Sequence, residues 1–94
     1  MSDFEQEVRA FFESNREMFG NDWAVYSKEE WAKRGEIYCN SSPFAITFEG
    51  PFYEMWNYGD YDGGKYAEEL RSIAKKHGYY FESAHGWMIS PYKI

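Results

Sequence analysis

The sequence has few of the residues and runs that define secreted or membrane proteins. Its 94 residues include one cysteine, Cys39, which excludes an internal disulfide framework and favours a reducing compartment. No apolar run approaches the roughly 18 residues that a membrane helix needs, and the first residues do not resemble a secretory signal peptide. We therefore expect a cytoplasmic protein with a single domain over residues 1–94, a length that supports one core.

Basic residues are also scarce. Ten Lys and Arg stand against 16 Asp and Glu, which gives a formal net charge of -6. The deficit lies in residues 1–60, which contain 12 acids and five bases, whereas residues 61–94 contain four acids and five bases. A nucleic-acid-binding domain carries a basic stripe with interleaved aromatic residues. Here the aromatic residues alternate with Asp and Glu, so direct binding of DNA or RNA is not expected.

Aromatic side chains, in contrast, are abundant. Four Trp, nine Tyr and eight Phe make up 22% of the chain, which is more than one small core can enclose. Some Tyr and Trp side chains are therefore expected on the surface, beside carboxylates. Large rigid aromatic groups anchor protein interfaces, and an acidic field attracts basic partners.

Two capping boxes predict where helices begin. Ser2 and Glu5 are three residues apart, as are Ser27 and Glu30. At this spacing the side chain of each residue can accept a hydrogen bond from the backbone amide of the other. A third helix is indicated by apolar residues at helical spacing that end before Gly78, a residue that commonly terminates helices. The predicted helices cover residues 3–18, 28–34 and 65–77.

Strands are predicted where the apolar period changes from helical to alternating, as in Phe44, Ile46 and Phe48. Short turns between these runs favour antiparallel neighbours. Pro91 lacks an amide donor, so we expect it at an edge or end of its strand. The predicted strands are 36–40, 44–48 and 52–56, forming a β-meander, and 79–84 and 87–92, forming a C-terminal hairpin around a His85-Gly86 turn.

The predicted fold class is therefore α+β, a single domain with about five antiparallel strands packed against three helices. The strand order stays open. The predicted core residues are Phe11, Ile46, Phe48, Leu70, Ile73 and Phe81.

The loop at residues 57–64 partly matches a calcium-binding loop. Asp60, Asp62, Gly63 and Glu69 fall on positions 3, 5, 6 and 12 of that pattern. Position 1 is Tyr58, however, where the pattern requires an acid, and a strand rather than a helix is predicted before the loop. The alternative is a Gly-rich connection whose aspartates precede a helix. We expect no metal ion and no other cofactor.

Catalytic constellations are equally incomplete. Cys39 could pair with His77 or His85 as nucleophile and base, but no local signature of a cysteine hydrolase surrounds it. A buried, inert thiol and a turn histidine are the simpler interpretations. We therefore do not expect an enzyme.

The acidic aromatic segment from residue 52 to residue 62 remains as the candidate site. Tyr and Trp are enriched at binding hot spots, and neighbouring carboxylates select partners rich in Lys and Arg. The alternative is a central core strand covered by helices on both faces. The predicted partner-binding residues are Glu49, Tyr53, Glu54, Trp56, Tyr58, Asp60, Tyr61 and Asp62.

These residues favour a non-catalytic protein-interaction module that binds a basic protein surface. One concrete form is a small acidic inhibitor that mimics DNA, with carboxylates placed where phosphates lie. The alternative is a domain with an aromatic-lined pocket that binds or transforms a small molecule or sugar. Nothing in the sequence fixes the oligomeric state.

Overall fold

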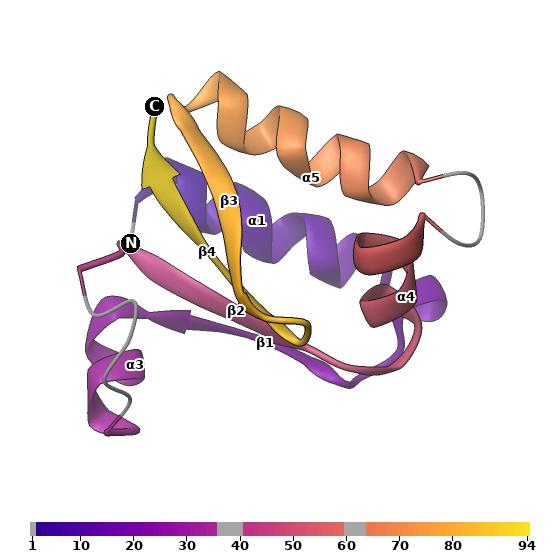
Figure 1. Cartoon of the computed structure of the whole chain (residues 1–94), viewed down its shortest axis with the longest axis horizontal. Helices are drawn as coiled ribbons and strands as arrows, with labels where there is room; N and C mark the ends of the chain where they lie inside the picture. The colour runs from indigo at the N-terminus through magenta and orange to yellow at the C-terminus, as the bar shows by residue number, and fades with distance from the viewer. Residues whose placement is uncertain (1, 36–40, 60–63) are drawn as a thin grey trace.

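The computed structural model describes residues 2–35, 41–59 and 64–94. Four of its strands form one antiparallel sheet in the order β1-β2-β4-β3 (Figure 1). The α+β class predicted from the sequence is confirmed. The elements are α1 (Asp3–Ser14), α2 (Arg16–Phe19), β1 (Trp23–Ser27), α3 (Lys28–Lys33), β2 (Phe44–Phe48), α4 (Gly50–Tyr58), α5 (Lys65–Lys76), β3 (Tyr79–His85) and β4 (Met88–Lys93).

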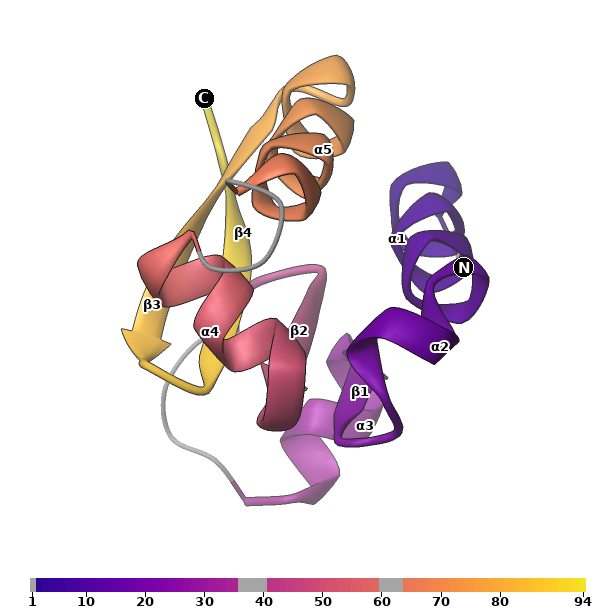
Figure 2. The ribbon, with the colours of Figure 1, turned by 90° about the vertical axis from the view of Figure 1, so that its right-hand side faces the viewer.

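The sheet separates two apolar clusters of unequal size. Phe44, Ile46 and Phe48 of β2 face the larger cluster, to which α1, α2, α4 and α5 contribute. Ala45 points to the opposite face, where it packs with Trp31 of α3 and Met88 of β4. Figures 1 and 2 show α1 and α5 packed together on the same side of the sheet. None of the helices in the described ranges is long and apolar enough to cross a membrane.

The larger cluster is mostly aromatic. The Phe52 ring lies 4.9 Å from that of Phe12 and 4.8 Å from that of Phe19, both in edge-to-face geometry. Tyrosines occupy the surface instead, since Tyr58 is 69% exposed and Tyr80 is 43% exposed. The expectation that some aromatic side chains lie on the surface is confirmed.

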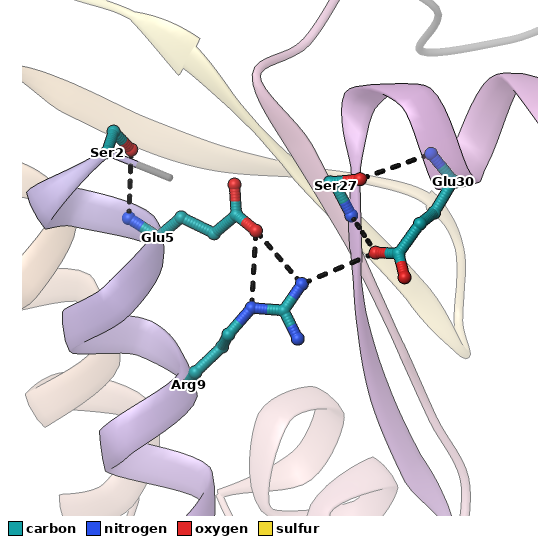
Figure 3. Close-up of polar contacts among 5 residues, drawn as sticks. All are labelled: Ser2, Glu5, Arg9, Ser27 and Glu30. Atoms are coloured by element: carbon teal, nitrogen blue, oxygen red, sulfur yellow. Dashed lines mark hydrogen bonds and ion pairs between the residues drawn. The ribbon is translucent and has the colours of Figure 1, made fainter.

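The capping box predicted at Ser27 is confirmed, and at Ser2 the bond from the Glu5 amide to the serine side chain is confirmed. Ser2 Oγ accepts from the Glu5 amide at 3.2 Å, and Ser27 with Glu30 forms a complete capping box. The Glu5 carboxylate is buried and accepts from Arg9, whose guanidinium also reaches Glu30 at 3.5 Å. Figure 3 shows Arg9 between the two capped helix starts. This network ties α1 to α3.

One of the predicted helices is divided in the structure. The helix predicted over 3–18 divides into α1 and α2 at Asn15, whose side chain donates to the Phe11 carbonyl at 2.8 Å. The side-chain amide thus satisfies a backbone carbonyl at the end of α1. The helix predicted over 28–34 is confirmed as Lys28–Lys33, and that over 65–77 as Lys65–Lys76.

The strand predicted over 52–56 is wrong, because these residues lie within helix α4. Pro51 occupies the first turn, where its missing amide donor costs nothing and its fixed φ suits a helix. Phe52, Met55 and Trp56 then face the core at helical spacing. Gly59, with φ of +67°, ends the helix in the left-handed conformation. The predicted β-meander therefore lacks its third strand.

Edge strand β1, Trp23–Ser27, was not predicted from the sequence. The strand predicted over 36–40 lies outside the described residues.

The C-terminal hairpin is confirmed, with its turn at Gly86-Trp87 rather than His85-Gly86. β4 is an interior strand, but its pairing with β2 covers only Met88 and Ile89, so Pro91 pairs across to β3 alone in the described sheet.

Four of the six predicted core residues are buried, namely Phe11, Ile46, Phe48 and Leu70. Ile73 and Phe81 are partly buried and pack against the same cluster. Leu70 and Ile73 therefore provide a graded test of how α5 packs.

We predict that Leu70→Ala lowers the free energy of unfolding by about 2–5 kcal/mol, because it removes buried apolar contacts and leaves a cavity. Ile73→Ala should cost less, since its side chain already meets water. Chemical denaturation of both variants measures the difference. A larger loss at Ile73 than at Leu70 would contradict the observed packing of α5.

A polar cluster holds the start of α1 against the end of α5. The Glu7 carboxylate lies 2.5 Å from Lys76 Nζ and 2.9 Å from His77 Nε2, and His77 stacks on Phe4 with ring centroids 5.1 Å apart. The hydrogen bond from Lys76, followed by that from His77, lowers the pKa of Glu7 below its ordinary value. The folded state thus favours the ionised carboxylate.

This lowered pKa predicts a pH-dependent contribution to stability. The contribution is present above the ordinary Glu pKa of about 4.3 and is lost as pH falls through the lower folded-state pKa. Glu7→Gln should therefore be less stable than the parent chain at neutral pH, and the gap should narrow below about pH 4.3. Thermal melts across pH measure this. The matched control is Glu17→Gln, an exposed position on α2; a gap at position 7 that is constant with pH would refute the prediction.

Candidate functional site

The predicted partner-binding residues separate into three groups. Glu49, Glu54 and Tyr58 are exposed, and Tyr53 is half-buried. Trp56 is only 9% exposed. Asp60, Tyr61 and Asp62 lie outside the described residues.

Trp56 belongs to the core of the fold. Its ring lies 6.0 Å from that of Phe81, and its indole N–H is 3.4 Å from Ser83 Oγ. Its remaining surface carries the Arg71 guanidinium, 4.4 Å from the ring centroid. Replacing Trp56 would therefore change stability, as the alternative core interpretation expected for this residue.

Two adjoining hollows lie beside the predicted residues, and we call them together the acidic groove. Glu49 and Trp87 line both hollows and thus join them. The first, of about 490 Å³, is lined by Asn21, Asp22, Trp23, Ala24, Arg34, Thr47, Phe48, Glu49 and Trp87. The second, of about 570 Å³, is lined by Glu49, Gly50, Pro51, Tyr53, Glu54 and Trp87.

Backbone hydrogen bonds bring the three chain segments of the groove together. The Glu49 amide donates to the Asp22 carbonyl at 2.7 Å, and the Phe48 amide donates to the Trp87 carbonyl at 2.8 Å. The Asp22 side chain also approaches Gly50, since a Cβ there would lie 3.2 Å from Asp22 Oδ2. The end of β2 thus holds the residues before β1 and the β3–β4 turn in one place.

Helix α4 packs against the tip of the β3–β4 hairpin and is hydrogen-bonded to it. Asn57 Nδ2 donates to the carbonyls of Gly86 and Tyr53, each at 2.8 Å. Tyr53 lies against the turn so closely that a Cβ on Gly86 would be 3.1 Å from its hydroxyl oxygen. Trp87 stacks on His85 with centroids 4.8 Å apart and ring planes at 11°. These contacts fix the aromatic walls of the groove.

Negative charge dominates the groove. Asp22, Glu49 and Glu54 are exposed, and no Lys or Arg of the described ranges forms an ion pair with them. Arg34 lines the first hollow, but its guanidinium lies over the Tyr26 ring at 4.8 Å and donates to the Tyr26 hydroxyl at 2.8 Å. The three carboxylates therefore face solvent without a cationic partner from the described residues.

The other candidate chemistries gain no support from the geometry. In the ranges that the structure describes, no three His, Cys, Asp or Glu residues are grouped to hold a metal ion. Asp60, Asp62 and Gly63 of the calcium-loop pattern lie outside those ranges, as does Cys39, and Glu69 is exposed on α5. His77 is engaged with Glu7.

Sequence reasoning found Glu49, Tyr53 and Glu54 but missed Asp22 and Trp87. Both missed residues come from segments far along the chain from α4. One signal for each is available, since Asp22 follows Gly20-Asn21 and Trp87 follows Gly86, and glycine marks turns that often display functional side chains.

Comparison with known proteins yields no match: no family model, curated protein or solved structure is significantly similar to the chain. Function must therefore be inferred from the residues themselves.

The close approach of Asp22 to Gly50 predicts an unequal cost of two glycine substitutions. Gly50 and Gly78 both have positive φ, of +63° and +82°, where an L side chain costs about 1–2 kcal/mol. Only at Gly50 would the new Cβ also press on Asp22, because nothing lies within 4 Å of a Cβ at Gly78. Gly50→Ala should therefore destabilise the fold more than Gly78→Ala in chemical denaturation. Equal losses of unfolding free energy would mean that the Asp22 side chain moves aside at no energetic cost.

Proposed function

We propose that the chain is a non-catalytic protein-interaction module that binds a basic segment of another protein in the acidic groove. The observation that carries this proposal is the placement of three carboxylates, those of Asp22, Glu49 and Glu54, around the Trp87 indole, with no cationic partner from residues 2–35, 41–59 and 64–94.

Arg and Lys side chains fit this chemistry in two ways. A guanidinium donates two parallel hydrogen bonds to a carboxylate and also stacks on an aromatic face, so it can use Glu49 and Trp87 together. The fold already shows such stacking, with Arg16 over Trp23 at 4.9 Å and Arg34 over Tyr26. The net charge of -6 would also steer a basic segment toward the protein.

The shape of the groove favours an extended partner. The two hollows adjoin at Glu49 and Trp87 and lie along the surface from Asn21 to Glu54. An extended segment rises about 3.3 Å per residue, so a few residues with alternating basic side chains can reach carboxylates in both hollows. A partner that itself binds nucleic acid is the special case of a DNA mimic, and competition by duplex DNA for that partner would support this form.

Charge neutralisation within the groove tests the proposal. The probe is a fluorescein-labelled peptide of four Arg-Ser repeats, whose affinity is measured by anisotropy at several salt concentrations. Glu49→Gln and Glu54→Gln should each weaken binding by about two- to fivefold, as expected for exposed ion pairs of roughly 0.2–1 kcal/mol. Trp87→Ala should weaken it by tenfold or more if the indole is a central anchor worth about 2 kcal/mol.

The matched control is Glu68→Gln, an exposed position on α5 with the same change in net charge. It should leave affinity nearly unchanged, because it lies outside both hollows. Equal weakening at positions 49, 54 and 68 would reduce the effect to overall charge and refute the groove. Tight binding of a neutral sugar or small molecule that shifts the Trp87 indole signal, without peptide binding, would favour the pocket alternative.

A further inference from the structure

A separate hollow lies beside the outer strand of the sheet, and it shares no lining residue with the acidic groove. Its volume is about 380 Å³. The residues that line it are Arg71 and Lys75 of α5, Tyr79, Tyr80 and Phe81 of β3, and Ile94.

This hollow opens at an edge of the sheet. β3 is a terminal strand in the order β1-β2-β4-β3. Tyr79 and Phe81 pack toward the main core, whereas Tyr80 alternates to the other face, so a hollow lined by all three reaches around the strand edge. Among the described residues, the backbone of 80–85 makes no backbone hydrogen bond outside the sheet. One row of amides and carbonyls is therefore available for pairing.

The hollow is basic in an otherwise acidic chain. Arg71 is held over the Trp56 ring at 4.4 Å, and Lys75 lies one helical turn further on an exposed position. No carboxylate of the described ranges pairs with either cation. The hollow thus displays two cations that have no carboxylate partner among the described residues.

Exposed apolar surface accompanies these cations. Ile94 is 79% exposed and Tyr80 is 43% exposed, which makes them two of the few large apolar side chains on the described surface. Apolar groups beside a free strand edge are typical of surfaces that receive an added strand.

We propose that an extended acidic segment of another protein adds to β3 as a further strand, with two acidic side chains directed to Arg71 and Lys75. The spacing fits. Residues four apart on a helix are separated by about 6 Å along its axis, and alternate residues of a strand by about 6.6–6.8 Å. Acidic residues at positions i and i+2 of the segment therefore match the two cations. Figure 1 shows α5 and β3 meeting at the turn between them, where such a segment would enter.

A second copy of this chain fits the same edge poorly. Pairing β3 with its own copy would bring a second set of basic residues to the edge, and two chains of net charge -6 repel each other. The register irregularity between Ser83 and His85 also disturbs the far end of the strand, a feature that discourages edge pairing there. The regular part, Tyr79–Ser83, is the part beside the basic hollow.

The test uses the full chain and a fluorescein-labelled peptide of sequence Thr-Glu-Val-Glu-Val-Thr, followed by anisotropy and by amide NMR shifts. The peptide should bind, and the amide signals of residues 79–83 should shift. Lys75→Gln should weaken binding about two- to fivefold, the range for an exposed ion pair. Lys65→Gln, an exposed position at the other end of α5, is the charge-matched control and should change little.

Two altered peptides separate the backbone from the charge contribution. Replacing both Glu by Gln should weaken binding, and N-methylation of the peptide backbone should abolish it, because strand addition depends on main-chain hydrogen bonds. Binding that survives N-methylation, or that shifts no amide of 79–83, would overturn the proposal. Equal effects of Lys75→Gln and Lys65→Gln, or a dimer formed through β3, would overturn it as well.

Discussion

The packing of one phenylalanine ring, that of Phe52, is the interaction on which the arrangement of the site depends. This ring contacts side chains from α1, α2, β2 and α4, with ring centroids 4.8 to 6.2 Å apart: Phe11, Phe12, Phe19, Phe48 and Trp56. Because Phe52 is anchored in this way, the first turn of α4 lies over the end of β2. Glu49 precedes that turn, and Tyr53 and Glu54 follow Phe52 around the helix. Core packing thus places three groove residues without any of them being buried.

The aromatic core also decides which aromatic side chains remain for the surface. All the phenylalanines except Phe81 are buried, and Phe81 is partly buried against the same cluster. The surface therefore receives amphipathic rings, whose polar atoms tolerate water. Trp87 and Tyr53 lie beside carboxylates in the groove, whereas Tyr80 interacts with Glu82 and also lines the hollow that contains Arg71 and Lys75. The groove and this hollow thus both have aromatic walls but differ in the charged residues that line them.

Local patterns predicted most elements, and their errors have local causes. Ser27 and Glu30 define the start of α3, and the alternation of Phe44, Ile46 and Phe48 defines β2. Residues 52–56 were misassigned because Phe, Tyr and Trp favour strands, while the Gly50-Pro51 pair that begins α4 is equally typical of a hairpin turn. The groove was only half predictable. Asp22 and Trp87 meet Glu49 through backbone hydrogen bonds between distant segments, which no local pattern encodes.

Ion pairing distinguishes the groove from helix α1. Elsewhere, acids on α1 are matched with bases: Glu5 with Arg9, Glu13 with Arg16, and Glu7 with Lys76. The exposed Glu13–Arg16 pair contributes little to stability, so folding alone does not require it. In the groove, Arg34 is close enough to line the first hollow, yet it stacks on Tyr26 rather than pairing with Asp22 or Glu49. A basic partner would supply cations that pair with these carboxylates, and the same side chains could stack on the Trp87 ring.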